Sequence, residues 1–556
     1  GAYQGADNLE VPETLQASLL ARLDRLGEAK EVAQIGAVIG REFDRGLLED
    51  VAGMPAERID AALTALANTD LLLQRGTLPS GRYVFKHALI QDAAYDSLLV
   101  RRRRELHQRV VTVMSRAGDQ EKDAQIEALA YHARKGELWY KALDYYRRAG
   151  KRANERSAHH EALRFMEAGL AAAEHLQNNR ETVEQVLDIC MNLRPSLGAF
   201  GMYERLLEAL SEANRLADEI GQGAVATIAN INKTHVLHHL GRVETGIAVG
   251  EETVDLATRY GDRGMLIAAS AVLAMGYFFH GEIERAAGLA SEHAEELATT
   301  FRYENLATTA TSSVNWLGNL SGMLSCLGRY ADGDRWSNEA LCIASETGKP
   351  FDDFHAKQWR SNFLIESARA EEAIALLEPL CAVVEEHDLG FGRSWAYGWL
   401  GDGFRSIGDF AKAEEALLYA NDAARRLNLR LSESWNLLRL ADVCVSTGRA
   451  QEALAHIDVV ERRGQDGGDW WHKPYMLRLR ARALTELGDL ETAQRTIEAA
   501  VDRAEDRGAI PEIAHCRAEM AAILTRRGNS SSARRAKDAA AKAYERLGVT
   551  AWLEAL

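Results

Sequence analysis

The apolar and polar positions of this chain follow a helical period, and a pair of helices returns about every forty residues. The clearest copy runs from Trp395 to about Leu429. Its second half places Ala413, Leu417 and Ala420 at i, i+4 and i+7, the spacing of a buried helical stripe. Each copy therefore predicts a hairpin of two antiparallel helices.

A short loop of a small residue followed by a polar one separates the two helices of each copy. Eight such loops follow one another in steps of forty residues, with a single step of forty-seven, at Gly241, Gly281, Gly328, Ala368, Gly408, Gly448, Gly488 and Gly528. Glycine suits a helix end because a positive φ costs it little. Small residues around the loops, such as Gly401 facing Ala413, let the two helices approach closely. A unit repeated at a fixed step predicts a helical solenoid, an architecture that binds partners.

Weaker copies extend this array toward the N-terminus, with turns near Gly136, Ser157 and Gly201. We expect a mostly all-α fold of about 8–11 helical hairpins over residues 117–556. The seven extra residues of the long step are expected near Thr299–Leu306, and the segment Ala536–Leu556 is expected to cap the array.

The first 116 residues have a different pattern. An amphipathic helix is predicted over Val11–Leu26. Three more helices are predicted over Ala29–Ile39, Leu47–Val51 and Pro55–Asn68, followed by strands at Leu71–Arg75 and Arg82–Lys86. Three helices and a β-hairpin predict a small winged-helix domain. Further helices follow, including a basic linking helix from Arg101 to Met114.

The repeats resemble tetratricopeptide repeats through Leu400-Gly401, Phe404, Ala413 and Ala420. They depart from that family in their length, forty residues instead of about thirty-four, and in lacking a closing proline. The departure is typical of the extended repeats of bacterial signalling proteins.

Three separated motifs, Val11–Leu26, Val38–Phe43 and Phe85–Tyr95, resemble the segment that follows the nucleotide-binding core in bacterial AAA/STAND-type signalling ATPases. Many of those proteins begin with a class III adenylate/guanylate cyclase domain and end in tetratricopeptide repeats. The resemblance implies a linker and helix at residues 1–28 after a missing ATPase core, a winged-helix domain with its basic linking helix at 29–116, and the repeat superhelix at 117–556. It also implies ATP as a cofactor of the parent protein, and no cofactor in this chain.

No catalytic motif accompanies these repeats. The nearest approach to a phosphate-binding loop, Gly36–Arg41, lacks the lysine and the hydroxyl residue that such a loop needs. His235 and His239 have the i, i+4 spacing of metal ligands, but no acidic partner lies between them, which favours a polar surface over a metal site. We expect this chain to be no enzyme.

The composition and charge of the chain limit the kinds of partner and the compartment that we expect. The net charge of −16 makes nucleic acid an unlikely partner, and residues 1–116 hold 15 basic and 16 acidic residues in spite of the basic run Arg101–Arg104. The six cysteines show no C-x-x-C spacing and are expected to be reduced core residues. No stretch of eighteen apolar residues is present, so we expect a cytoplasmic protein that does not enter a membrane.

A stripe of aromatic and charged positions in the repeats is the candidate binding site. In the tetratricopeptide register, residues forty apart face the concave groove, and neighbouring positions add charge: Asn315, His355, Asn362, Trp395, Asp402, Arg405, Trp435, Asp442, Tyr475, Arg478 and Arg482, with His515 next in the series. Rings interleaved with carboxylates and guanidiniums suit a peptide or a small polar ligand. The alternative is that Trp395 and Trp435 simply pack between adjacent repeats.

These features together predict a non-catalytic regulatory or sensor module. It would bind a protein, a peptide or a small effector in the repeat groove and control ATPase or cyclase domains upstream in the same chain, and it could form oligomers. One alternative is the regulatory part of a transcriptional regulator that resembles the maltose-operon activators. Another is a free-standing scaffold for protein assembly.

Overall fold

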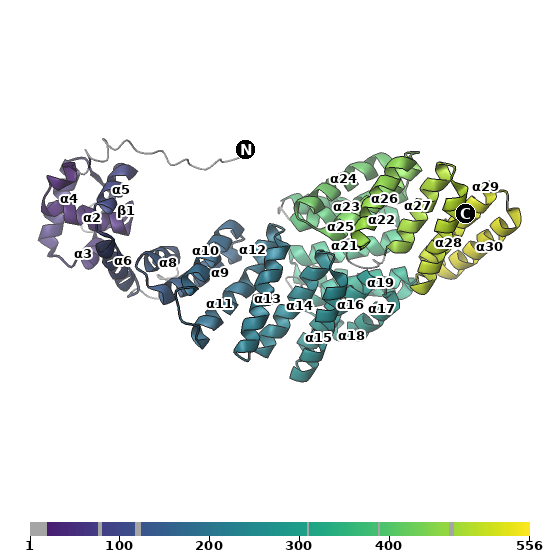
Figure 1. Cartoon of the computed structure of the whole chain (residues 1–556), viewed down its shortest axis with the longest axis horizontal. Coiled ribbons are helices and arrows are strands. Elements are labelled where there is room, and N and C mark those ends of the chain that lie inside the picture. The colour runs from purple at the N-terminus through teal and green to yellow at the C-terminus, as the bar shows by residue number, and fades with distance from the viewer. Residues whose placement is uncertain are drawn as a thin grey trace. The chain divides into compact units, whose positions relative to one another are not determined.

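The computed structural model describes residues 19, 21–75, 81–116, 124–307, 311–386, 390–465 and 472–556. The chain divides into two compact units, Gly1–Ser196 and Leu197–Leu556 (Figure 1). Helices make up nearly all of the regular structure, which confirms the predicted mostly-α class. The predicted helix at Val11–Leu26 lies mainly outside the described residues.

The N-terminal unit begins with helices and one small sheet. Its elements are α2 (Glu28–Ile39), β1 (Glu42–Asp44), α3 (Arg45–Ala52), α4 (Ala56–Asn68), β2 (Leu72–Arg75), β3 (Arg82–Phe85), α5 (Ala88–Asp96) and α6 (Val100–Met114). The predicted hairpin is present as the antiparallel pair β2–β3. The winged-helix assignment and the domain boundaries at residues 28 and 116 stay predictions.

The strand β1 was missing from the sequence prediction. It pairs antiparallel with β3 and gives the sheet the order β1-β3-β2. Three residues are too few to show a period of two, and only Phe43 among them is buried. Its ring packs against Tyr83 and Phe85 of β3, so tertiary packing holds this strand in place.

The rest of the N-terminal unit is helical. It contains α8 (Ile126–Lys135), α9 (Trp139–Glu155), α10 (His159–Ala173) and α11 (Arg180–Asn192), and α12 (Arg194–Ala199) spans the boundary with the second unit. The predicted turn near Gly136 is present, although the residue with positive φ is Glu137 (54°).

A line of buried hydrogen bonds connects α5, α6 and α8. The hydroxyl of Tyr95 lies 3.1 Å from Nε2 of His107, and Nδ1 of His107 lies 2.8 Å from Nδ1 of His132. His132 also makes a hydrogen bond to the backbone of Ile39 at the end of α2. Because each bond needs one donor and one acceptor, this order fits two neutral imidazoles.

The second unit is an array of paired helices. It consists of α13 (Tyr203–Glu219), α14 (Gly223–His239), α15 (Val243–Tyr260), α16 (Arg263–His280), α17 (Ile283–Ser291), α18 (Ala294–Ala298), α19 (Ser312–Cys326), α20 (Tyr330–Thr347), α21 (Pro350–Glu366), α22 (Ala370–Glu386), α23 (Gly390–Ser406), α24 (Phe410–Arg426), α25 (Arg430–Ser446), α26 (Ala450–Gln465), α27 (Lys473–Glu486), α28 (Leu490–Asp506), α29 (Ile510–Arg526), α30 (Ser530–Leu547) and α31 (Thr550–Glu554).

The eight predicted turn residues all take the left-handed conformation, with φ from 61° at Ala368 to 101° at Gly281. A second series of positive-φ residues lies twenty residues after five of them, at the turn that follows the second helix: Gly261, Gly348, Asn428, Gly508 and Gly548. The true conformational period is therefore one helix, about half of the sequence repeat.

The small residue at position 401 allows the two helices of its hairpin to pack closely, as predicted. A Cβ atom built on Gly401 would lie 2.6 Å from Cγ of Leu417 and 3.1 Å from the backbone oxygen of Ala413. Both distances are shorter than ordinary contact, so α23 and α24 approach as closely as the backbone allows.

The irregular step in the repeat also falls where the sequence placed it. The second helix of that repeat is broken into α17 and α18, and the following connection includes Thr299–Leu306 before α19 begins at Ser312. At the C-terminus the last regular helix, α30, begins at Ser530, earlier than the expected cap, and α31 follows it.

Turns that are far apart in sequence meet within the second unit, so its helices coil back on themselves. A Cβ atom on Gly201 would lie 2.7 Å from Cα of Leu427, and one on Gly281 would lie 2.5 Å from Nε of Arg507. The rings of Tyr330 and Trp552 lie 6.4 Å apart in the same way. Early repeats thus contact late ones, and the coil encloses an interior.

Among the described residues one helix, α16, has the length and apolar composition to cross a membrane. It is 72% buried inside the array and packs against its neighbours on both sides, as the central helix of a repeat core does. The cysteines depart in part from the expectation of core residues, because Cys342 is exposed.

Candidate functional site

The interior of the second unit holds a cavity of about 750 Å³. Residues of α21, α22, α23 and α25 line it together with residues of α27, α29 and α31. Arginines, carboxylates and aromatic rings from these helices line it. Positions forty residues apart converge here because the turns of the coil place the same helix face toward one axis.

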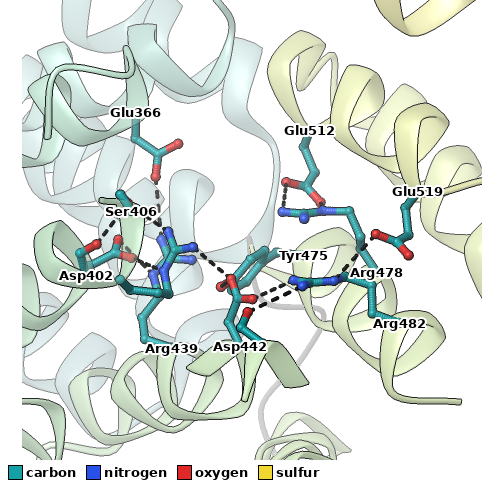
Figure 2. A network of polar contacts seen from close by, with 12 residues as sticks. Glu366, Asp402, Ser406, Arg439, Asp442, Tyr475, Arg478, Arg482, Glu512 and Glu519 are labelled. Carbon is teal, nitrogen blue, oxygen red and sulfur yellow. Dashed lines mark hydrogen bonds and ion pairs between the residues drawn. The ribbon is translucent and has the colours of Figure 1, made fainter. Parts of the chain in front are cut away.

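Asp442, on α25, is the centre of the polar contacts at this cavity (Figure 2). Its Oδ2 accepts hydrogen bonds from Nη1 of Arg405 and from the hydroxyl of Tyr475, both at 2.9 Å. Its Oδ1 accepts a bond of 2.6 Å from Nη1 of Arg482. Three successive repeats, with first helices α23, α25 and α27, are joined through this one carboxylate.

Arg439 extends the network on one side of Asp442. Its Nε lies 2.9 Å from Oδ2 of Asp402, and its Nη2 lies 3.5 Å from Oε1 of Glu366. The guanidinium carbon is 3.6 Å from the ring centroid of Trp435 and 4.4 Å from that of Tyr475. Two rings and a buried carboxylate therefore fix this cation in place.

A second group of pairs lies on the other side of Asp442. Arg478 donates to both oxygens of Glu512, at 2.7 and 3.1 Å, and Nε of Arg482 lies 3.5 Å from Glu519 (Figure 2). Bidentate geometry makes the Arg478–Glu512 pair the best satisfied of these contacts.

The pKa values of two carboxylates of the cavity shift in opposite directions. Burial acts to raise the pKa of Asp442, but the guanidiniums of Arg405, Arg482 and Arg478 outweigh it and hold that pKa below its usual range. At Glu366 burial prevails over Arg439, and the pKa is raised.

Two imidazoles of the cavity wall are neutral. Burial and the nearby cations lower the pKa of His472 to about 3 and that of His515 to about 4. Neither ring therefore adds positive charge to the cavity at neutral pH.

The structure brings six of the eleven predicted groove residues to the cavity wall: Arg405, Trp435, Asp442, Tyr475, Arg478 and Arg482. Asp402 lies behind the wall, fully buried, and contacts Arg405 and Arg439. Trp435 also packs on Trp399 at 5.1 Å, so it belongs to the core and to the wall at once.

The other four predicted residues do not line this cavity. Trp395 is half-buried against Phe391, and His355 packs on Phe351 and Phe354. Asn315 and Asn362 lie on α19 and α21, outside the lining. Both contacts lie within one helix, α23 for Trp395 and α21 for His355, whereas the contact of Trp435 with Trp399 joins the first helices of adjacent repeats.

Sequence reasoning missed several residues of the network. Arg439, Glu366, Glu512 and Glu519 carry much of its charge, and Trp552 lines the cavity from α31. Arg439 had a signal, because it lies four residues after Trp435 and three before Asp442, on one helix face. No sequence signal pointed to Glu366 or Trp552, since the coiling of the array brings them to the cavity.

The histidine pair is formed but lacks further metal ligands. Nε2 of His235 and Nε2 of His239 lie 3.2 Å apart. Within the described part of the chain, no group of three or more His, Cys, Asp or Glu side chains could hold a metal ion.

Comparison with known proteins supports the fold. No protein-family model matches the chain. A Rap protein solved in complex with competence and sporulation factor is similar in structure, with a TM-score of 0.50 and 13% identity over 65% of this chain and 98% of that one. The second unit is thus a tetratricopeptide-like helical repeat.

Two further similarities concern longer proteins. An uncharacterized protein of Rhizobium meliloti (strain 1021) is 35% identical over 162 residues, which is 28% of this chain and 15% of that protein's length. A STAND protein with a tetratricopeptide-repeat sensor from Pyrococcus horikoshii covers 99% of this chain and 67% of its own, but a TM-score of 0.29 carries no argument about fold.

Proposed function

We propose that the second unit is a recognition module whose interior cavity binds a peptide or a segment of a partner protein. The observation that carries this proposal is the cavity of about 750 Å³ with its wall of arginines, carboxylates and rings. That volume lies within the roughly 300–1,000 Å³ of ordinary ligand sites. Fixed charges on rigid helices suit recognition, because little ordering is needed on binding.

The proposal includes a regulatory output through the rest of the parent protein. The resemblance of Val38–Phe43 and Phe85–Tyr95 to STAND-type ATPases supports ATPase or cyclase domains upstream in the same chain. The short share of the Rhizobium relative that this chain covers is consistent with a module of a longer protein. A ligand would act by favouring one packing of the repeats over another.

The absence of a catalytic role is part of the same proposal. Arginines of the cavity hold Asp402, Asp442 and Glu512 in ion pairs. Their arrangement is that of a binding surface.

The proposal is tested by selecting peptides from a displayed library on the full chain and measuring their retention on two variants. Ala551→Trp places a large ring on an exposed lining position, whereas Glu545→Trp adds the same ring to an exposed position of α30 outside the lining. We expect retention to fall at least roughly tenfold with Ala551→Trp and to stay unchanged with Glu545→Trp. Equal retention on both variants would place binding outside the cavity and refute the proposal.

A further inference from the structure

Glu366 lines the cavity, and its carboxylate is only weakly ion-paired. Among the described residues its one ion pair, to Nη2 of Arg439, is 3.5 Å long, and 30% of its side chain is exposed. By comparison, Glu512 takes two bonds of 2.7 and 3.1 Å from Arg478. Charge-assisted hydrogen bonds are normally about 2.7–2.9 Å long, so the Arg439 contact satisfies Glu366 only in part.

Arg439 cannot move to Glu366 without losing better contacts. It lies 2.9 Å from Asp402, and its guanidinium stacks on Trp435 and Tyr475. Only 5% of its side chain is exposed. The shortfall at Glu366 is therefore built into the packing of α25 and α27.

The network around Asp442 also has more negative than positive side chains. Its nine charged side chains are four arginines and five carboxylates, namely Arg405, Arg439, Arg478, Arg482, Glu366, Asp402, Asp442, Glu512 and Glu519. The neutral imidazoles of His472 and His515 add no compensating charge. Burial, with smaller contributions from Asp402 and Glu512, raises the pKa of Glu366 in spite of Arg439 and Arg405.

We propose that Glu366 receives an ammonium or guanidinium group of the ligand that enters the cavity. This inference rests on the proposed function and adds the chemistry of the ligand. A cation at Glu366 would complete the network, because it would bring the five carboxylates and their cations into balance. A lysine or arginine side chain of a peptide carries such a group, and so does a free polyamine.

The test uses pools of pentapeptides with identical random flanks and one fixed class of central residue. The first pool carries Lys or Arg at the centre, the second Asp or Glu, and the third Ala or Leu. Retention of each pool is measured on the immobilised full chain, with spermidine or free arginine added as competitors in separate arms. The arms distinguish a peptide source of the cation from a free polyamine or amino acid.

Two glutamates with side chains of similar exposure give a matched pair of variants. Glu366→Gln removes the poorly paired charge, whereas Glu414→Gln removes a charge outside the cavity wall that Arg449 holds at 2.7 and 2.9 Å. We expect wild type and Glu414→Gln to retain the basic pool at least roughly tenfold better than the acidic pool, and Glu366→Gln to lose that preference. Because the charge of Glu366 is poorly met, Glu366→Gln should melt no lower than wild type, which separates loss of binding from loss of fold.

The outcomes separate the two proposals. A preference for the acidic or apolar pool, or an unchanged preference in Glu366→Gln, overturns the role of Glu366 and leaves the cavity as the binding site. Retention of no pool also overturns it, and the proposed function then depends on the library peptides and the Ala551→Trp variant alone. Displacement of the basic pool by spermidine at equal concentration supports the role and identifies a free polyamine as the source.

Discussion

Arg439 and Asp402 form an ion pair of 2.9 Å in which 5% and 0% of the two side chains are exposed. Removing one member of a buried pair leaves the other charge without compensation, at a cost of about 3–5 kcal/mol. We expect Arg439→Ala to lower the free energy of unfolding by about 3 kcal/mol, the low end of that range, because Asp402 keeps Arg405 as a partner. Urea unfolding followed by circular dichroism measures this change.

The matching control is a pair exposed to solvent. Arg426 and Asp422 are 77% and 54% exposed, so Arg426→Ala should change the free energy of unfolding by less than about 0.5 kcal/mol. The double variant Arg439→Met with Asp402→Leu should recover part of the loss, since neither charge of the pair is left without the other and Arg405 keeps Asp442 as a partner. Equal costs for Arg439→Ala and Arg426→Ala would contradict the buried pair.

Ala368 is the turn residue at which the chain lacks the usual glycine. Its φ of 61° is one that residues with a Cβ adopt at a cost of about 1–2 kcal/mol. We expect Ala368→Gly to stabilise the second unit by about 1 kcal/mol, less the entropy that glycine adds to the unfolded chain. The reverse change, Gly408→Ala, should cost a similar amount, because the φ of 83° strains an alanine. No clash adds to that cost, since the new Cβ would meet nothing within 4 Å. A fall in melting temperature with Ala368→Gly would contradict the left-handed conformation.

Gly201 has a second constraint besides its φ of 65°. A Cβ there would lie 2.7 Å from both Cα and the backbone oxygen of Leu427, at a distant turn. Backbone atoms cannot give way as a side chain can, so Gly201→Ala should cost about 1–3 kcal/mol more than Gly408→Ala. Hydrogen exchange should show faster exchange at the Leu427 turn in Gly201→Ala only. Unchanged exchange there would mean that the two turns do not touch in solution.

The buried pair of His107 and His132 predicts acid sensitivity in the N-terminal unit. Burial lowers the pKa of His107 to about 3 and that of His132 to about 4, below the 6.5 of a free imidazole. Both rings are neutral when folded, so their contribution is fully present above about pH 6.5 and is lost as the pH falls toward 4. Unfolding of this unit, followed by the fluorescence of its one tryptophan, Trp139, should shift to lower temperature over that range.

A variant pair checks the assignment of that effect. His132→Gln should flatten the dependence on pH, because only one of the two imidazoles then remains to be protonated on unfolding. His87→Gln, at an exposed position of the same unit, should leave the slope unchanged. An equal slope in wild type and His132→Gln would assign the acid sensitivity to other groups.

Much of the fold could be predicted because the helix ends and the helix packing of each repeat depend on residues that lie close together in the sequence. Gly408 ends a helix and Gly401 allows close packing, and both effects depend on residues a few positions away. The half-period could have been found as well, because Gly261, Gly348, Gly508 and Gly548 lie twenty residues after members of the first series. Nothing in the sequence pattern excluded it.

The site was less predictable because the cavity depends on long-range geometry. Trp435, Asp442 and Tyr475 of the forty-residue stripe lie at the cavity wall, because repeats stack with one face inward. His355 and Trp395 belong to the same stripe but lie outside the lining, against rings of their own helices. The part of these residues in binding stays a prediction. The radius and pitch of the coil decide which repeats face one another, and small rotations summed over many helices set both.

The contacts between distant turns change how the second unit should unfold. In an open solenoid each repeat touches only its neighbours, so stability is a sum of local terms and the ends fray first. Here Gly201 meets Leu427 and Tyr330 meets Trp552, which adds terms between repeats that lie far apart in the chain. Loss of the last helices should therefore weaken the distant repeat that contains Tyr330, and residues 197–556 should melt as one cooperative block, with a midpoint that no single repeat determines.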